Sequence, residues 1–287
     1  MRLPGLTVVY VAGRVAYDGT DYCGYQYQVN VPTIQGELER ALAEFTDFEG
    51  RILGSGRTDT GVHASGQVIA VHAPWQHDPA DLQRAWNVRL PRSIQVRALR
   101  EASIDFHPRF SAVARTYRYT VDVHAGSGEN GAPPKFSPLT ERYALFVPYA
   151  LNLDAMQRAS ACLVGEHDFA TFGRPPQGEN TVRTIFLAEW SEAEQVPALL
   201  SDSPSRRYVF TICANAFLYR MVRSIVGTLL EIGRGKRSVG TMQAALDARD
   251  RSRAASPAPP HGLTLERVDY PADLTPWPAD GSAGIDA

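Results

Sequence analysis

The sequence predicts an α+β protein built around an antiparallel or mixed β-sheet. Segments typical of strands and of helices alternate along the 287 residues, without the regular strand–helix repeat of a parallel α/β fold. One long amphipathic helix is indicated near the C-terminal end, and no short-period repeat is visible. This length suits one large domain or two medium ones.

The first half contains three predicted strands and two predicted helices. Val8–Tyr17 is rich in Val and Tyr and ends at the turn signal Asp18-Gly19-Thr20, so it is a predicted strand. Thr33 is a plausible N-cap for a helix with one apolar stripe, made of Ile34, Leu38, Ala41, Leu42 and Phe45. A glycine-rich loop then spans Leu53–Ala64. The other predicted elements are a strand over Gln67–His72, a short helix over Asp81–Asn87 and a strand over Ile94–Leu99.

The second half begins near Phe106. Arg115–Val121 is a predicted strand with Tyr117 and Tyr119 on one face, and His124–Pro138, which carries several Gly and Pro residues, is a predicted surface loop. Further predicted elements are a helix over Leu153–Leu163 and strands over Val182–Trp190 and Arg207–Ala214.

Asn215–Ile232 is the clearest predicted helix. One face is apolar, with Arg223 at the edge of the stripe and Arg220 further outside it; the stripe contains Leu218, Met221, Val222, Ile225, Val226 and Leu229. Arg223 can therefore bury its stem while its guanidinium reaches a cleft wall. From Ala272 the chain is rich in Pro, Asp, Gly and Ala, and residues 272–287 are expected to be a disordered tail.

Composition excludes several classes of protein. No apolar run approaches the roughly 18 residues that a membrane span needs, and Leu3–Ala12 is too short for a secretory signal, which predicts a cytoplasmic protein without a membrane partner. The three cysteines are far apart, and no histidine pair has HxxxH spacing, so neither a disulfide framework nor a metal site is expected.

The formal net charge of −2 argues weakly against a nucleic-acid partner, but phosphate contacts need only a local basic stripe. The basic residues are almost all arginine, whose planar fork suits phosphate geometry. They gather at Arg89, Arg92, Arg97 and Arg100, at Arg220 and Arg223, at Arg234, Lys236 and Arg237, and at Arg249, Arg251 and Arg253. Composition alone still favours ordinary solvated charge.

Asp59 is the first candidate for chemistry. It lies in the glycine-rich loop two residues after Arg57, and a nearby guanidinium favours the ionised carboxylate that a nucleophile requires. The alternative is a turn aspartate that caps its own backbone. Asp59-Thr60-Gly61 also matches the triplet of aspartic proteases, which need a second carboxylate; no second such triplet exists here, so only a homodimer could supply it.

Tyr117 and Tyr119 alternate with Arg115 and Arg118, and such a strand could stack RNA bases. The alternative is that both tyrosines face a core. For His63, which adjoins the Asp59 motif, a structural hydrogen bond is favoured over acid–base catalysis.

Taken together, these segments resemble the TruA family of tRNA pseudouridine synthases over roughly residues 14–271. The resemblance rests on stretches that occur in family order: Tyr17-Asp18-Gly19-Thr20 with Gly24; Ser55-Gly56-Arg57-Thr58-Asp59 with Gly61-Val62-His63-Ala64; Phe106-His107 and Arg109-Phe110-Ser111; Tyr117-Arg118-Tyr119; Gly165-Glu166-His167-Asp168-Phe169; Val182-Arg183-Thr184-Ile185; and Met221-Val222-Arg223 with Gly227. Tyr25 departs from the family, which usually has Trp there.

The resemblance implies a pseudouridine synthase fold: two α/β subdomains, 1–105 and 106–271, that share an extended antiparallel or mixed sheet with a central positively charged cleft. It implies a homodimer that binds tRNA and isomerises uridines at positions 38, 39 and 40 of the anticodon arm, with no cofactor and no metal.

The resemblance also assigns the site residues. Asp59 is the expected catalytic carboxylate, Arg223 its ion-pair partner, and Tyr117 stacks on the uracil and is a candidate general base. Arg57, Arg220 and His63 are expected to bind the substrate. A non-catalytic RNA-binding module and the dimeric protease remain as alternatives.

Overall fold

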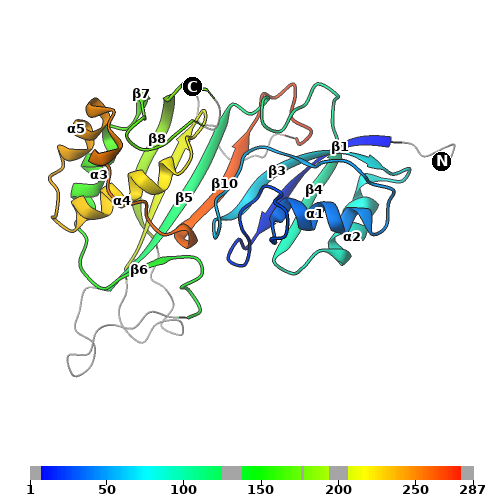
Figure 1. Ribbon diagram of the computed structural model, residues 1–287, viewed down its shortest axis with the longest axis horizontal. Coiled ribbons are helices and arrows are strands. Elements are labelled where there is room, and N and C mark those ends of the chain that lie inside the picture. Colours follow the sequence, from blue (N-terminus) through cyan, green and yellow to red (C-terminus); the bar gives the residue numbers. More distant parts are fainter. Residues whose placement is uncertain (1–7, 125–137, 176–177, 194–205, 279–287) are drawn as a thin grey trace.

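A computed structural model describes residues 8–124, 138–175, 178–193 and 206–278. These residues form five α-helices and one ten-stranded mixed sheet, which confirms the α+β class (Figure 1). The strand order is β4-β1-β3-β10-β5-β9-β8-β7, with β2 paired to β3 and β6 paired to β5. The sheet therefore runs without a break from the N-terminal half to the C-terminal half.

The N-terminal half consists of antiparallel strands and two helices. The strands are β1 (Val8–Tyr17), β2 (Leu53–Gly54), β3 (His63–Pro74) and β4 (Ile94–Glu101), and the helices are α1 (Ile34–Ala43) and α2 (Pro79–Arg89). Thr33 caps α1, as predicted, by accepting a hydrogen bond from Gly36 N. Trp86 of α2 donates from Nε1 to Leu38 O of α1, so the two helices are joined within one core.

The C-terminal half consists of further strands and three helices. The strands are β5 (Ala114–Val123), β6 (Leu145–Val147), β7 (Gly165–Asp168), β8 (Val182–Ala193) and β9 (Arg206–Ala214), and the helices are α3 (Leu153–Ala161), α4 (Met221–Gly233) and α5 (Thr241–Ala248). Tyr119 and Val121 point from β5 into a core that they share with Phe210 of β9 and with α4. For Tyr119, the alternative prediction that the side chain faces a core is therefore confirmed.

Strand β10 (Leu263–Asp269) joins the two halves, since it pairs in parallel with β3 and antiparallel with β5. Each half has its own hydrophobic cluster, and Tyr117 packs against both of them. Phe106, Leu265 and Val268 belong to the cluster of the first half. The division into 1–105 and 106–271 stays a prediction, but the packing crosses residue 106.

Helix α4 begins six residues later than the sequence pattern predicts. Arg220 has a left-handed backbone (φ 61°), which a right-handed helix cannot include, and Tyr219 N donates instead to Arg174 O. Leu218 is nevertheless buried, as the apolar stripe predicted, although it lies outside the helix. The prediction of helix over residues 215–220 is therefore wrong.

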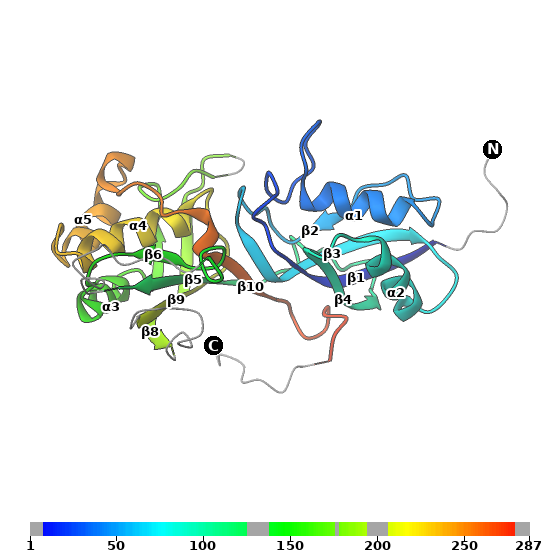
Figure 2. The same ribbon diagram turned by 90° about the horizontal axis from the view of Figure 1, so that it is seen from below.

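The C-terminal segment also differs from its prediction. Trp277 is only 6% exposed, donates from Nε1 to Ala98 O and packs edge-on against Phe106, while Arg14 lies over its ring. Figure 2 shows α1 above the sheet and the segment after β10 below it. The expectation of a disordered tail is therefore wrong for residues 272–278. Residues 279–287, and residues 125–137 of the predicted surface loop, lie outside the described residues.

Candidate active site

Three predicted site residues from distant segments meet at the junction of the two halves. Asp59 lies in the loop between β2 and β3, Tyr117 lies on β5, and Arg223 lies in the first turn of α4. Arg223 Nη1 donates to Asp59 Oδ2 at 2.9 Å. The two side chains are 13% and 19% exposed, so the ion pair is largely desolvated but remains open to solvent on one side. The pairing that the resemblance implied is present.

Two glycines let the loop that carries Asp59 pack closely against the end of β1. A Cβ on Gly24, whose φ is +90°, would lie 2.7 Å from Thr58 O, and a Cβ on Gly19 would lie 2.0 Å from Val62 O. The loop is further held by a 2.8 Å hydrogen bond between the hydroxyls of Tyr17 and Thr58. These contacts fix the backbone on both sides of Asp59.

The Arg223 side chain is oriented by backbone as well as by the carboxylate. Its Nε donates to Ala258 O at 2.8 Å, and Ala258 N donates back to Arg223 O at 2.9 Å. The close approach depends on Gly227 one turn later, where a Cβ would lie 2.1 Å from Ser256 O. The segment before β10 is thereby fastened to α4, with the guanidinium held toward Asp59.

The Tyr117 ring lies edge-on to Phe217, with ring centroids 5.1 Å apart. Burial raises the pKa of the Tyr117 phenol to about 12, the Arg115 guanidinium opposes this rise, and the Asp59 carboxylate adds to it. The phenol is therefore neutral at physiological pH. This state suits a stacking ring better than a proton acceptor.

Arg57 and Arg220 are both exposed. Arg220 lies with its guanidinium carbon 5.0 Å from the centre of the Tyr219 ring. Neither guanidinium lies within ion-pair distance of a carboxylate in the described part of the chain. Both cations are thus available to a polyanion.

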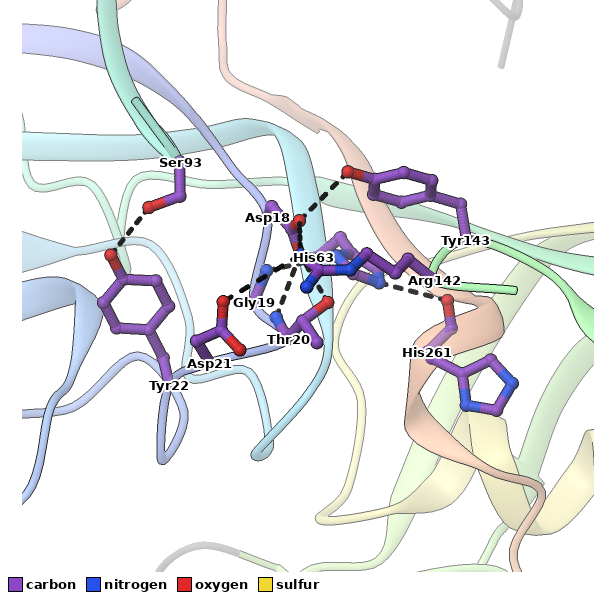
Figure 3. Close-up of polar contacts among 10 residues, drawn as sticks. All are labelled: Asp18, Gly19, Thr20, Asp21, Tyr22, His63, Ser93, Arg142, Tyr143 and His261. Carbon is purple, nitrogen blue, oxygen red and sulfur yellow. Dashed lines mark hydrogen bonds and ion pairs between the residues drawn. The ribbon is translucent and has the colours of Figure 1, made fainter. Parts of the chain in front are cut away.

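His63, in contrast, is 3% exposed and occupied by protein contacts (Figure 3). Its Nδ1 lies 3.0 Å from Gly19 N and 3.2 Å from Asp18 Oδ1, and its Nε2 lies 3.1 Å from His261 O. A direct bond to substrate would require one of these contacts to break. Its role in substrate binding stays a prediction.

Asp18, which the sequence analysis named only within a turn signal and a family stretch, contacts His63. Its carboxylate accepts hydrogen bonds from Thr20 and, at 3.0 Å, from the Tyr143 hydroxyl, with Arg142 Nη1 3.4 Å away. Figure 3 shows this carboxylate between the end of β1 and the segment that carries Arg142 and Tyr143. Burial acts to raise the pKa of Asp18, but the hydrogen bonds from Thr20 and Tyr143 outweigh it and the pKa lies below its ordinary value of 3.8.

Arg115 was missed as a site residue. Its guanidinium donates to four carbonyl oxygens, those of Ser55, Arg109, Ala112 and Asn215. It thereby joins the loop that carries Asp59 to the turn before β5 and to the segment before α4. Its position two residues from Tyr117, on the same strand face, was the signal that could have found it.

Within the ranges that the structure describes, no group of three or more His, Cys, Asp or Glu side chains could hold a metal ion. The three cysteines, Cys23, Cys162 and Cys213, are free thiols. None of the described helices combines the length and apolar character needed to cross a membrane.

The chain is similar in sequence to known proteins. A family model described as tRNA pseudouridine synthase matches residues 14–111 and 159–271. A protein of Chloroflexus aurantiacus described as tRNA pseudouridine synthase A is 40% identical over 270 residues, which cover 93% of this chain and 91% of the relative. Relatives with the same description from Roseiflexus castenholzii and Chlamydia trachomatis are 41% and 40% identical, over 92% and 90% of this chain and 91% of each relative. The chain therefore belongs to the tRNA pseudouridine synthase family, whose members are isomerases that convert uridine to pseudouridine.

Proposed function

We propose that this protein isomerises uridine to pseudouridine in the anticodon arm of tRNA, at positions 38, 39 and 40. The observation that carries the proposal is the Asp59–Arg223 ion pair, which offers an ionised carboxylate at the junction of the two halves. Family membership supports tRNA as the substrate, and the TruA resemblance is the source of the three positions.

The reaction breaks the N1–C1′ bond of the uridine, turns the base and joins C5 to C1′. C5 loses a proton, N1 gains one, and no electrons leave, so the stoichiometry requires no cofactor or co-substrate. The Asp59 carboxylate attacks C1′ or C6, or stabilises positive charge that develops on the sugar. Arg223 donates to this carboxylate at 2.9 Å and so places a positive charge beside it.

The target base must leave its stack before the carboxylate can reach it, which costs a few kcal/mol. Arg57, exposed two residues before Asp59 in the same loop, fills the vacated space or holds the displaced nucleotide in this proposal. The neutral Tyr117 ring stacks on the flipped uracil. Arg220 and its neighbours hold phosphates of the arm.

A homodimer in which one tRNA contacts both subunits, and a cytoplasmic location, belong to the same proposal. They rest on the TruA resemblance and on the chemistry of the substrate.

The test is to incubate unmodified tRNA with the purified protein and to map pseudouridine by position. Pseudouridine at 38, 39 or 40 is the expected product. Product confined to other positions would contradict the anticodon-arm proposal, and tRNA bound without any new nucleoside would favour the RNA-binding module. A protease would be indifferent to tRNA and sensitive to a transition-state peptide mimic.

A further inference from the structure

The turn over residues 107–111 is held by several internal hydrogen bonds. The Nδ1 atom of His107 accepts hydrogen bonds from Arg109 N at 3.1 Å and from Phe110 N at 3.2 Å. Ser111 closes the turn, because its N donates to His107 O at 2.9 Å and its Oγ accepts from His107 N at 3.0 Å. The backbone on both sides of Phe110 is therefore fixed before any ligand arrives.

This turn lies beside the loop that carries Asp59. Arg115 donates to Arg109 O at 2.7 Å and also reaches Ser55 O at 3.4 Å, two residues before Arg57. The Tyr270 hydroxyl donates to Pro108 O at 2.7 Å, which fastens the turn from the other side. Movement of the turn relative to the catalytic loop is thus limited by side chains that bond to both.

The fixed turn presents an aromatic ring to solvent. Phe110 is 75% exposed, its ring centre is 4.4 Å from that of His107, and the Arg109 guanidinium carbon lies 5.5 Å from the ring centre. Single exposed apolar residues are common on protein surfaces. Phe110 differs from them because hydrogen bonds fix the backbone that carries its ring and a cation lies beside the ring.

We propose that Phe110 and Arg109 form a stacking site for an unpaired nucleobase of the substrate RNA, next to the flipped uridine. The ring would stack on the base, and Arg109 would meet the adjoining phosphate. This inference rests on the proposed function, since it names a further contact between the same site and its RNA.

The positive charges on segments joined to the turn favour RNA over a protein as the ligand of the Phe110 site. The exposed cations of Arg57 and Arg220 lie on segments that Arg115 joins to the turn, through Ser55 O and Asn215 O. A polyanion that passes the active site would meet Arg57, Arg220 and Arg109 in the same region.

The experiment measures the binding of an unmodified tRNA transcript by Phe110→Ala and Phe110→Trp variants of the full chain. Phe110→Ala should bind about 5- to 140-fold more weakly, the loss expected from one base stack. Its single-turnover rate at saturating tRNA should stay within about threefold of the wild type, because Phe110 is not assigned to the chemistry. Phe110→Trp keeps an aromatic face and should restore the affinity.

Ile104→Ala is the matched control, since Ile104 is 73% exposed and lies in the segment just before the turn. It should bind tRNA as the wild type does. Unchanged binding by Phe110→Ala, or an equal loss in Ile104→Ala, would overturn the stacking site. A changed oligomeric state of Phe110→Ala in sedimentation velocity would also overturn it, because the ring would then serve a contact between protein chains.

Failure of this inference is distinguishable from failure of the proposed function. Wild-type protein that forms pseudouridine while Phe110→Ala binds normally removes only the stacking site. Wild-type protein that binds tRNA without forming product, with weaker binding by Phe110→Ala, removes the proposed reaction and keeps the stacking site.

Discussion

A single guanidinium, that of Arg223, donates to Asp59 Oδ2 at 2.9 Å and to Ala258 O at 2.8 Å. It thereby connects the loop that carries Asp59, the first turn of α4 and the segment before β10. The N-terminal end of a helix carries partial positive charge, so the carboxylate lies where an anion is favoured. The bond to the Ala258 carbonyl orients the guanidinium independently of Asp59.

Asp59→Asn should reduce pseudouridine formation at least about a thousandfold, because an amide of the same shape is neither a nucleophile nor an anion. tRNA binding should stay within about threefold of the wild type. Single-turnover nucleoside analysis measures the first effect and filter binding the second. Asp21→Asn is the control, since that carboxylate is 75% exposed. An appreciable rate in Asp59→Asn would remove Asp59 from the mechanism.

Tyr117→Phe should keep product formation within about tenfold of the wild type, since a phenol with a pKa of about 12 is a poor proton acceptor at neutral pH. Tyr117→Ala should lose far more, because the ring itself is removed. The rate at saturating tRNA, measured across pH, separates these roles. A collapse of the rate in Tyr117→Phe would restore the general-base role.

Arg115→Lys should destabilise the fold by about 2–4 kcal/mol, because an ammonium group cannot reach the four carbonyls that the guanidinium satisfies. Urea unfolding measures the loss. Arg118→Lys is the control on the same strand, where an exposed pair with Glu266 is worth at most about 1 kcal/mol. Equal losses in the two variants would contradict the bridging role of Arg115.

Elements with a regular local sequence pattern were predicted from the sequence, and elements whose pattern is interrupted were not. Val8–Tyr17 was predicted with the bounds of β1 because its composition and its turn signal agree. Strand β10 was not predicted, since a register shift between Leu265 and Arg267 breaks the alternation of its apolar residues. Trp277 was assigned to a tail because one aromatic residue among Pro and Asp has no periodicity, and only the tertiary fold supplies its pocket.

The contacts within the site likewise could be predicted only in part. Asp59 and Arg223 are 164 residues apart, so no local pattern could pair them, and the family resemblance supplied the contact. Asp18 and Arg115 act through backbone and hydroxyl groups of other segments, which a sequence does not display. The catalytic roles themselves stay predictions.

Asp18→Asn should weaken the acid dependence of stability. The folded-state pKa of Asp18 lies below 3.8, so its ionised form stabilises the fold above that pH, and this contribution is lost as pH falls through the folded value. The variant should be less stable at pH 7, and its loss of stability on acidification should be smaller than that of the wild type.

The measurement is the urea midpoint between about pH 7 and pH 3. Asp154→Asn, at an exposed carboxylate on α3, is the control and should follow the wild type. Parallel acid profiles for Asp18→Asn and wild type would show that Asp18 does not carry this dependence.

Arg57→Gln should weaken tRNA binding and make it less sensitive to salt. Each phosphate that a cation neutralises releases counterions, so the slope of log Kd against log salt should fall by about 0.7–0.9 when one such contact is lost. Arg57 is exposed two residues before Asp59, whereas Arg84, exposed on α2 and paired with Asp81, lies in another part of the N-terminal half. Arg84→Gln should therefore keep the wild-type slope. If tRNA binding by the wild type did not respond to salt, phosphate recognition by these arginines would be contradicted. An unchanged slope in Arg57→Gln would show that Arg57 does not contact a phosphate.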